Sequence, residues 1–413
     1  MATPARQACP TPPKLLKDHA FMRLWSATTA SGLATWALPF ILGLAVADRA
    51  LSATGLGVVL AVRTAGFLIA VPVGGVLADR YPRRTVVLIA GLAAALATPV
   101  ISAGLGTSIV VMAVAAAVVG AGQGACRPAL QALTAEVVDE SRRQRANAAI
   151  TLAVRVTTLV SPGLTVLASA LVDVTGLLLI TGILWLVTAF GPPRPHIAGP
   201  AASADRAGFL AEFVEGVREA RRHPWFLAGL AALTAVISFG YSATGVILPL
   251  VSRDRYGSEA VLAAATTAYV LGALLGALLI ARWRPANQGW AALAALACYG
   301  FAPLSLMLPL HPAFVIAAYV IAGLGIELFN VPWFTATQRE IEPGKLARVS
   351  SLDFMLSYGL APVGLALIAP AVDGLGAVPV LAFCVLACVA VPILAALAPG
   401  SRHFSRHRPA VRP

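Results

Sequence analysis

The feature that most constrains this chain is a succession of apolar stretches, each long enough to cross a lipid bilayer. Hydrophobic residues make up 59% of the chain and charged residues 12%, against roughly 25% charged in a typical soluble domain. We therefore expect an all-α membrane protein with twelve transmembrane helices. The expected spans are residues 22–47, 54–78, 85–104, 107–135, 146–172, 174–191, 225–252, 259–281, 289–309, 312–338, 346–370 and 375–398.

The placement of basic residues predicts the orientation of the chain. Eleven Lys and Arg residues fall in the short loops on one side of these spans, against three on the other. The positive-inside rule makes the richer side cytoplasmic, and an even number of spans places both termini there. Orientation and contact with lipid account for the net charge of +12, so we expect no nucleic-acid partner. We expect a monomer in the bacterial inner membrane, with no cleavable signal.

The two halves of the chain end their fourth and tenth expected spans alike. Pro128, Ala132 and Glu136 recur at the same spacing as Pro332, Ala336 and Glu340. A parallel repeat of six helices places a substrate site between two bundles. The expected parts are a cytoplasmic tail (1–21), an N-terminal six-helix bundle (22–191), a cytoplasmic linker with an amphipathic helix (192–223), a C-terminal six-helix bundle (224–398) and a basic cytoplasmic tail (399–413).

Five charged residues lie inside the expected spans, where a charge at mid-bilayer costs roughly 2.5–3.5 kcal/mol and should face the protein interior. We expect Arg63 to be structural, and Glu327 to lie deeper than the others. Burial favours a neutral carboxylic acid and a nearby arginine favours the carboxylate, so such a pair can act as a proton switch. The alternatives are a static salt bridge between the halves, or acids kept neutral by burial. The candidates for proton coupling or substrate binding are Glu327, Asp353, Arg127, Arg155, Gln123 and Asn330.

Three aromatic residues, Trp36, Trp333 and Tyr358, are candidates for lining a cavity, although each could equally face lipid or other helices. Pro162 and Gly163 are expected to bend the fifth span, because proline removes a backbone hydrogen bond. We expect no metal, no cofactor and no catalytic residue. The five cysteines lack metal-ligand spacing, and no H-E-x-x-H, G-x-S-x-G or phosphate-binding loop is present.

The short loop after the second span reads Gly75-Val-Leu-Ala-Asp79-Arg80-Tyr-Pro-Arg83-Arg84. It supplies a glycine for close helix approach, an acid for a helix N-terminus and arginines for carboxylates or lipid phosphate. This pattern resembles the loop signature of the major facilitator superfamily, and the resemblance extends over residues 18–397. It implies alternating access between two bundles. It also implies a conformational lock, in which Asp79 lies at the N-terminus of the eleventh helix and the arginines bond Glu136.

Three shorter segments resemble the drug-efflux branch of that superfamily, which includes macrolide and enterobactin exporters. They begin at Arg127, Arg145 and Arg348. The resemblance implies a proton-coupled exporter of a hydrophobic or amphiphilic small molecule, such as a drug, antibiotic, siderophore or secondary metabolite. The fifth helix departs from the glycine-rich G-P-x-x-G-G element of many antiporters, since residues 161–166 keep Pro162 but lack most of the glycines. A proton-coupled uptake permease of the same fold is the alternative, and a non-transporting receptor or membrane enzyme is less favoured.

Overall fold

The computed structural model describes residues 15–194, 209–258, 260–359 and 361–405, and every regular element in these ranges is a helix. The elements of the first half are η1 (Leu15–Lys17), α1 (His19–Ala47), α2 (Ala53–Arg80), α3 (Arg83–Gly104), α4 (Ile109–Val137), α5 (Glu140–Ser169) and α6 (Val174–Phe190). Those of the second half are α7 (Phe209–Arg221), α8 (Pro224–Ala235), η2 (Val236–Tyr241), α9 (Ser242–Asp254), α10 (Ala260–Arg282), α11 (Gln288–Ala297), η3 (Cys298–Gly300), α12 (Phe301–Met307), α13 (Pro312–Glu340), α14 (Leu346–Gly359), α15 (Ala361–Leu375) and α16 (Ala377–Ala396).

Local sequence explains where several helices begin. The side chains of Asp18, Ser52, Ser108 and Asp173 each accept a hydrogen bond from a backbone N–H in the first turn of the helix that follows. These contacts satisfy donors that a helix N-terminus leaves without an intrahelical partner. The loops therefore lie close to the positions that hydropathy predicts.

In the described part of the chain, ten continuous helical stretches are long and apolar enough to cross a membrane. The expectation of an all-helical membrane protein is confirmed. The spans expected at 174–191 and 346–370 differ from the other ten: α6 has only 17 residues, and the second is divided between α14 and α15. The count of twelve spans is therefore a proposal.

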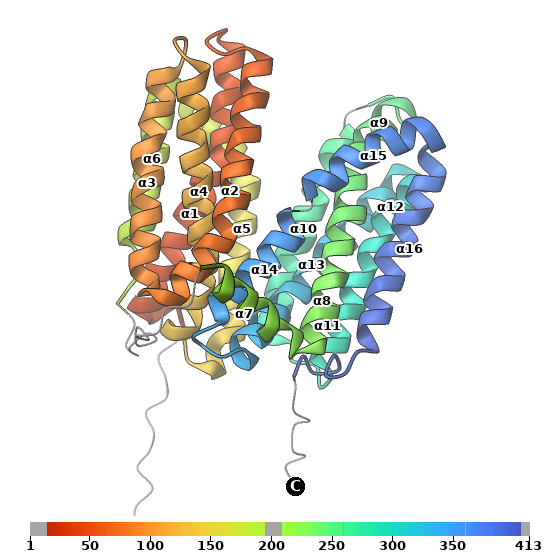
Figure 1. The fold of residues 1–413 in the computed structure, drawn as a ribbon. Helices are drawn as coiled ribbons and strands as arrows, with labels where there is room; N and C mark the ends of the chain where they lie inside the picture. Colours follow the sequence, from red (N-terminus) through yellow and green to blue (C-terminus); the bar gives the residue numbers. More distant parts are fainter. Residues whose placement is uncertain (1–14, 195–208, 259, 360, 406–413) are drawn as a thin grey trace, which may run out of the picture.

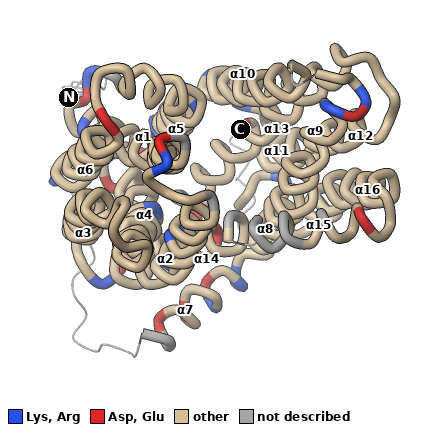
Figure 2. The backbone as a smooth tube through the Cα atoms, turned by 90° about the horizontal axis from the view of Figure 1, so that it is seen from above, with Lys and Arg blue, Asp and Glu red and all other residues tan. Residues whose placement is uncertain are grey.

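The helices form two groups that diverge from one end of the molecule (Figure 1). Helices α1–α6 make one group, helices α8–α16 make the other, and α7 lies across the end where the groups converge. We call this the linker end, and the opposite end the far end. Seen along the molecule, α2 lies beside α14 and α5 lies beside α10 (Figure 2), and the same pairs are in contact.

Glycine allows two helix pairs to pack at close range. A Cβ atom at Gly120 of α4 would collide with the Arg63 carbonyl of α2, and one at Gly323 of α13 would collide with the Tyr269 carbonyl of α10. Small residues of this kind let membrane helices approach and gain van der Waals contact. The α2–α4 and α10–α13 pairs occupy matching places in the two halves, as the expected repeat requires.

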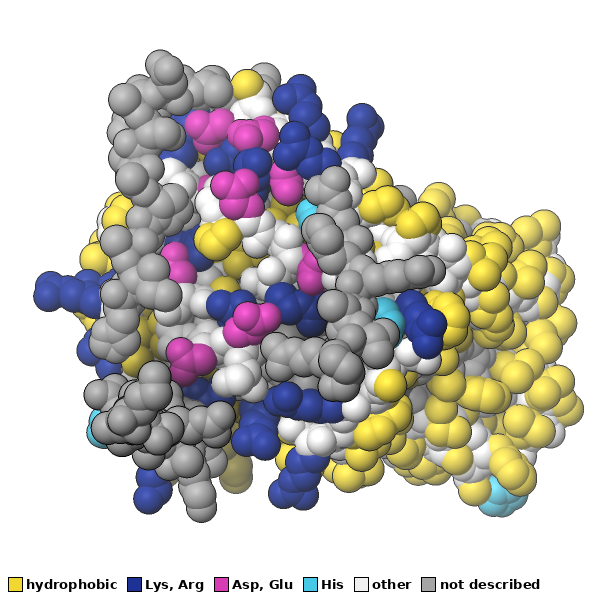
Figure 3. Space-filling model, turned by 90° about the horizontal axis from the view of Figure 1, so that it is seen from below, with side chains coloured by type: hydrophobic (Ala, Val, Ile, Leu, Met, Phe, Trp, Pro, Cys, Tyr) yellow, Lys and Arg dark blue, Asp and Glu magenta, His cyan; other side chains and the backbone are white. Residues whose placement is uncertain are grey.

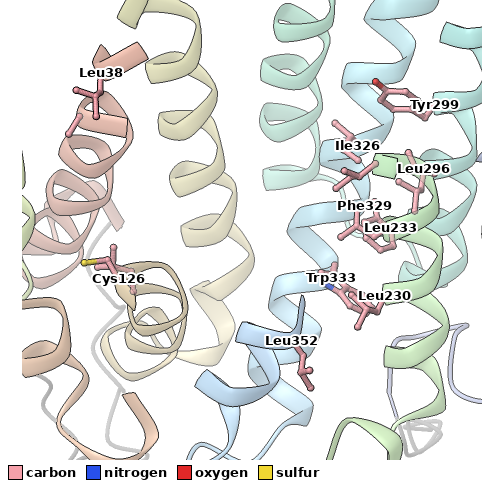
Figure 4. Packing of buried hydrophobic residues seen from close by; sticks show 14 of the residues in the cluster. Leu38, Cys126, Leu230, Leu233, Leu296, Tyr299, Ile326, Phe329, Trp333 and Leu352 are labelled. Carbon is pink, nitrogen blue, oxygen red and sulfur yellow. The ribbon is translucent and has the colours of Figure 1, made fainter. Parts of the chain in front are cut away.

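The core of the second group is aromatic. The ring of Trp333 stacks on Phe226 and Phe329 at centroid distances of 4.9 and 5.4 Å. Figure 4 shows Trp333 and Phe329 directed toward Leu230 and Leu233 of α8. These side chains hold α8 against α13 and leave other faces of α13 to meet the first group.

Candidate functional site

Asp79 joins the two groups at the linker end. Its carboxylate accepts hydrogen bonds from the backbone N–H groups of Ala347 (3.1 Å) and Arg348 (3.0 Å), in the first turn of α14. The Arg348 Nε also donates to it, at 3.1 Å. An anion is favoured at a helix N-terminus because unpaired N–H groups and the helix dipole both point toward it. This is the contact that the loop pattern implies.

Gly75 lies one turn before Asp79 and permits that contact. A Cβ atom there would lie 2.5 Å from the Ser351 Oγ and 2.9 Å from the Ala347 carbonyl oxygen. A larger residue would push α2 and α14 apart, so the glycine is required by close approach rather than by backbone conformation.

The loop arginines have separate partners. Arg83 forms an ion pair with Glu136 of α4 at 2.8 Å, as the resemblance implies, and it also donates to the Pro343 carbonyl of the second group. Arg80 pairs with Glu212 of α7 at 2.6 Å, and Arg84 donates to the Pro192 carbonyl at 3.1 Å. The role of this network as a conformational lock is a prediction.

Helix α5 carries successive contacts to the second group. Nearest the linker end, the Gln144 amide donates to the carbonyls of Ile280 (2.6 Å) and Trp283 (3.1 Å). One turn further in, the Asn147 amide donates to Thr335 Oγ1 and Gln338 Oε1, both at 2.9 Å. Polar contacts of this kind close the linker end between α5, α10 and α13.

The innermost of these contacts is an ion pair between Arg155 of α5 and Glu327 of α13. Both the Nε and Nη2 of Arg155 lie against one carboxylate oxygen, Oε1, at 2.6 and 2.5 Å. The other oxygen, Oε2, is buried and has no hydrogen-bond partner among the described residues. The Glu327 side chain has no solvent exposure, whereas that of Arg155 is 20% exposed.

The expected helix ends place Glu327 deeper than Arg155, and the structure corrects this. Helix α5 begins at Glu140, six residues before the expected start at 146. At roughly 1.5 Å per residue, the extra turns add about 9 Å to the depth of Arg155. The two side chains therefore lie at the same level and meet.

Two adjoining pockets, of about 310 and 170 Å³, lie between the groups, and the smaller one reaches toward the linker end as far as Asn147. They share Thr35, Trp36, Arg127 and Arg155, and so form one cavity; Arg155 lines both parts, and Glu327 lines the second. A cavity of this size falls at the lower end of the range for drug-sized ligands. Among the predicted site residues, those that line it are Trp36, Gln123, Arg127, Arg155, Glu327 and Asn330.

Arg63 also lines the cavity, where its Nη2 donates to Gln123 Oε1 at 2.9 Å and to the Thr35 carbonyl at 3.1 Å. A charge in an apolar span already indicates an inward face, and that signal could have placed Arg63 at the site. Tyr269 and Tyr299 line the same pocket and were not predicted. Tyr299 lies in η3, a 3-10 turn between α11 and α12. A hydropathy profile does not distinguish such a turn from the apolar helices on either side.

Asp353 and Trp333 do not line either pocket, contrary to the expectation for both. Asp353 accepts hydrogen bonds from Trp333 Nε1 and Ser357 Oγ, each at 3.1 Å, in the interior of the second group. Trp333 itself has no exposed surface. Helical periodicity finds the polar face of α14 but does not say whether that face meets the cavity or a neighbouring helix. The side chain of Tyr358 lies outside the described residues.

Pro162 lies inside α5, which continues without a break to Ser169, and a Cβ atom at Gly163 would meet open space. The bend at these residues stays a prediction. In the seventh span the helix changes type, and the π-helical segment η2 brings Val236, Ile237 and Tyr241 to the cavity wall. Such π segments often mark functional sites because they re-aim side chains.

Among the described residues, no group of histidine, cysteine or acidic side chains could hold a metal ion. The arrangement is that of a membrane transporter: two groups of apolar helices, joined at one end, with a polar cavity between them. The sequence profile of the Major Facilitator Superfamily matches residues 24–365, and the chain belongs to this family. It is therefore a multi-pass membrane protein.

Comparison with solved structures agrees with the family assignment. The crystal structure of the human organic anion transporter MFSD10 (TETRAN) matches with a TM-score of 0.75 and 16% sequence identity. The match covers 93% of this chain and 100% of the human chain, and at this identity it shows a common fold. A comparison with curated proteins found no match.

Proposed function

We propose that this chain is a proton-coupled exporter of hydrophobic or amphiphilic small molecules that works by alternating access. The observation that carries the proposal is the Arg155–Glu327 ion pair, because it joins the two groups inside the cavity. A proton on Oε2 would neutralise Glu327 and remove most of its attraction to Arg155. The contact between α5 and α13 would weaken, and the linker end could then open.

The proposed orientation places the linker end in the cytoplasm of a bacterial cell, with both termini on that side. Figure 3 supports it, since Lys, Arg, Asp and Glu side chains gather on this end while hydrophobic side chains cover the flank of the molecule. In this orientation the contacts of Asp79 stabilise an outward-facing state. Residues 22–191 and 224–398 are proposed to move as two six-helix domains of a monomer.

The proposed substrate class rests on segments of this sequence and on the lining of the cavity. The human protein of similar fold is an organic anion transporter, but likeness in fold does not assign a substrate here. Support for export comes from the resemblance to the drug-efflux branch at Arg127, Arg145 and Arg348. The cavity contributes aromatic and aliphatic walls suited to an amphiphilic molecule.

Dye and drug efflux in a pump-deficient bacterial host tests the proposal. Cells with the intact chain should retain less dye than cells with Glu327→Gln, and a protonophore should abolish the difference. Everted vesicles should accumulate substrate when a proton gradient is imposed. Proton-driven release from everted vesicles would indicate uptake into the cell and would reject export. Efflux that a protonophore leaves unchanged would reject proton coupling.

A further inference from the structure

The charges around the cavity are unbalanced. Among the described residues, its lining includes three arginines, Arg63, Arg127 and Arg155, and one carboxylate, Glu327, which pairs with Arg155. The formal charge of the lining is therefore positive. At low dielectric a net charge attracts a counter-charge far more strongly than in water. The cavity therefore favours an anion.

Neutral groups contact Arg63, and aromatic rings lie beside Arg127. Arg63 donates to an amide oxygen and a backbone carbonyl, and its buried Nε has no hydrogen-bond partner among the described residues. The guanidinium of Arg127 lies 5.8 Å from the ring centre of Phe67 and 5.9 Å from that of Phe354. Aromatic rings attract a cation but do not neutralise it. A carboxylate, sulfonate or phosphate could bind both guanidinium groups through charge-assisted hydrogen bonds.

The opposite wall of the same pocket is aromatic and aliphatic. Tyr269 lies between Tyr241 and Tyr299, at ring-centre distances of 6.3 and 6.1 Å, and Val236 and Ile237 complete the wall. The arginines come from the first helix group and these residues from the second. A ligand with an anionic end and an apolar body would therefore contact both groups at once.

We infer that the cavity binds amphiphilic organic anions, with the anionic group on Arg63 and Arg127 and the apolar body on Tyr241, Tyr269 and Tyr299. The inference rests on the proposed function only in treating this cavity as the transport site. A lipophilic cation is disfavoured, because it would meet like charges and because the lining carboxylate of Glu327 is already paired with an arginine.

Equilibrium binding to the purified full-length chain tests this with dyes that share one body: dansylglycine (anionic), dansylglycinamide (neutral) and dansyl-ethylenediamine (cationic). We expect the anion to bind at least tenfold more tightly than the cation. Arg63→Gln and Arg127→Gln should each weaken binding of the anion about tenfold and leave the neutral dye within about twofold. Arg221→Gln, which removes an exposed arginine of α7, is the matched control.

Equal or tighter binding of the cation would overturn the inference, as would a failure of the anion to bind. Inorganic phosphate is added as a competitor. If it displaces dansylglycine at similar concentrations, the apolar wall has no role and the amphiphilic class is wrong. The comparison of dyes on the unaltered protein stands even where a variant fails to fold. Binding without transport would reject the proposed function alone, whereas proton-driven export of the cation only would reject the substrate class alone.

Discussion

At the scale of single residues, the two membrane acids differ in their surroundings although the sequence presents them alike. Glu327 pairs with an arginine from the other helix group, and one of its oxygens has no partner among the described residues. Asp353 uses both oxygens to accept hydrogen bonds from neutral groups of its own helix group. We therefore propose that Glu327 couples proton binding to movement of the two groups. For Asp353 we propose a role in packing within one group.

Replacing Glu327 by Gln should lower stability, because it leaves the Arg155 charge without its carboxylate. We expect a loss of roughly 1–3 kcal/mol, below the ~3–5 kcal/mol of a fully buried pair, since the Arg155 side chain keeps 20% exposure. Adding Arg155→Gln should restore much of the loss without restoring transport. Thermal unfolding of the single and double variants in detergent measures this. Additive losses in the double variant would contradict an interaction between the two residues.

Replacing Asp353 by Asn should leave transport largely intact. The amide oxygen can still accept the hydrogen bond from Trp333 Nε1, which lies in the same helix group, so the contacts between the groups are kept. Efflux measured beside Glu327→Gln in the same host provides the comparison. A loss of proton-dependent efflux as complete as that of Glu327→Gln, with normal expression and folding, would show that Asp353 takes part in coupling.

At the scale of helices, close contact between α2 and α4 depends on a residue without a side chain. Gly120→Ala should destabilise the protein, because its Cβ would collide with the Arg63 carbonyl and force the helices apart. Gly163→Ala is the control, since its Cβ would meet open space and alanine favours the helix by about 1 kcal/mol. We expect a lower unfolding temperature for the first variant and an equal or higher one for the second. Equal temperatures would contradict the role of close packing.

Helix α7 contacts both groups at the linker end. Arg80 of α2 pairs with Glu212, and Arg348 of α14 pairs with Glu215 at 2.9 Å. Lys345, just before α14, lies 3.3 Å from Glu219. Residues 209–221 therefore form a helix whose acidic residues face Arg80, Lys345 and Arg348. Its docking stabilises the closed linker end.

The double variant Glu212→Gln/Glu215→Gln should loosen α7. Surface ion pairs contribute about 0.2–1 kcal/mol each, and Glu212 and Arg348 are buried, so losing both pairs should raise amide hydrogen exchange in residues 209–221 about 2- to 30-fold or more. Asp254→Asn, which removes an exposed acid at the far end, should have no such effect. Unchanged exchange in both variants would show that apolar contacts of α7 suffice for docking.

Acid should loosen the same helix. Burial alone would raise the pKa of Glu219, but Lys345 outweighs it through a hydrogen bond and its charge, with help from Arg222 and His223, and the pKa falls below its ordinary 4.5. The carboxylate therefore stabilises docking above pH 4.5, and this contribution is lost as pH falls through the lowered value. Exchange of α7 relative to α16, corrected for intrinsic rates, should increase on acidification. Glu219→Gln should remove most of that pH dependence.

At the scale of the whole molecule, the groups meet at the linker end and diverge toward the far end (Figure 1). Polar contacts from α5 and α2 close the linker end, while the larger pocket lies further from that end. A transporter that alternates must break these contacts in every cycle. The structure therefore represents one of at least two proposed states.

Joining the groups at the linker end should stop transport. Asn147 and Thr335 come from different groups and share a 2.9 Å hydrogen bond, so cysteines at these positions should react with a short bifunctional thiol reagent. We expect cross-linked protein to lose efflux while keeping its unfolding temperature or gaining stability. Each single-cysteine variant, treated alike, is the control. Normal efflux by fully cross-linked protein would contradict the proposed opening of this end.

Most of the helices could be predicted from the sequence, because apolar length, capping residues and loop charges are local properties. The loop pattern also identified Asp79, Gly75 and Arg83 as a joint between helices. Which polar faces meet became clear only in the folded chain: Glu327 contacts Arg155 across the groups, whereas Asp353 contacts Trp333 within one group. Periodicity predicts the polar face of a helix but not its neighbour, and whether a buried acid serves coupling or packing depends on that neighbour. The charge of the cavity likewise emerges only when Arg63, Arg127 and Arg155, from three different helices, line one space.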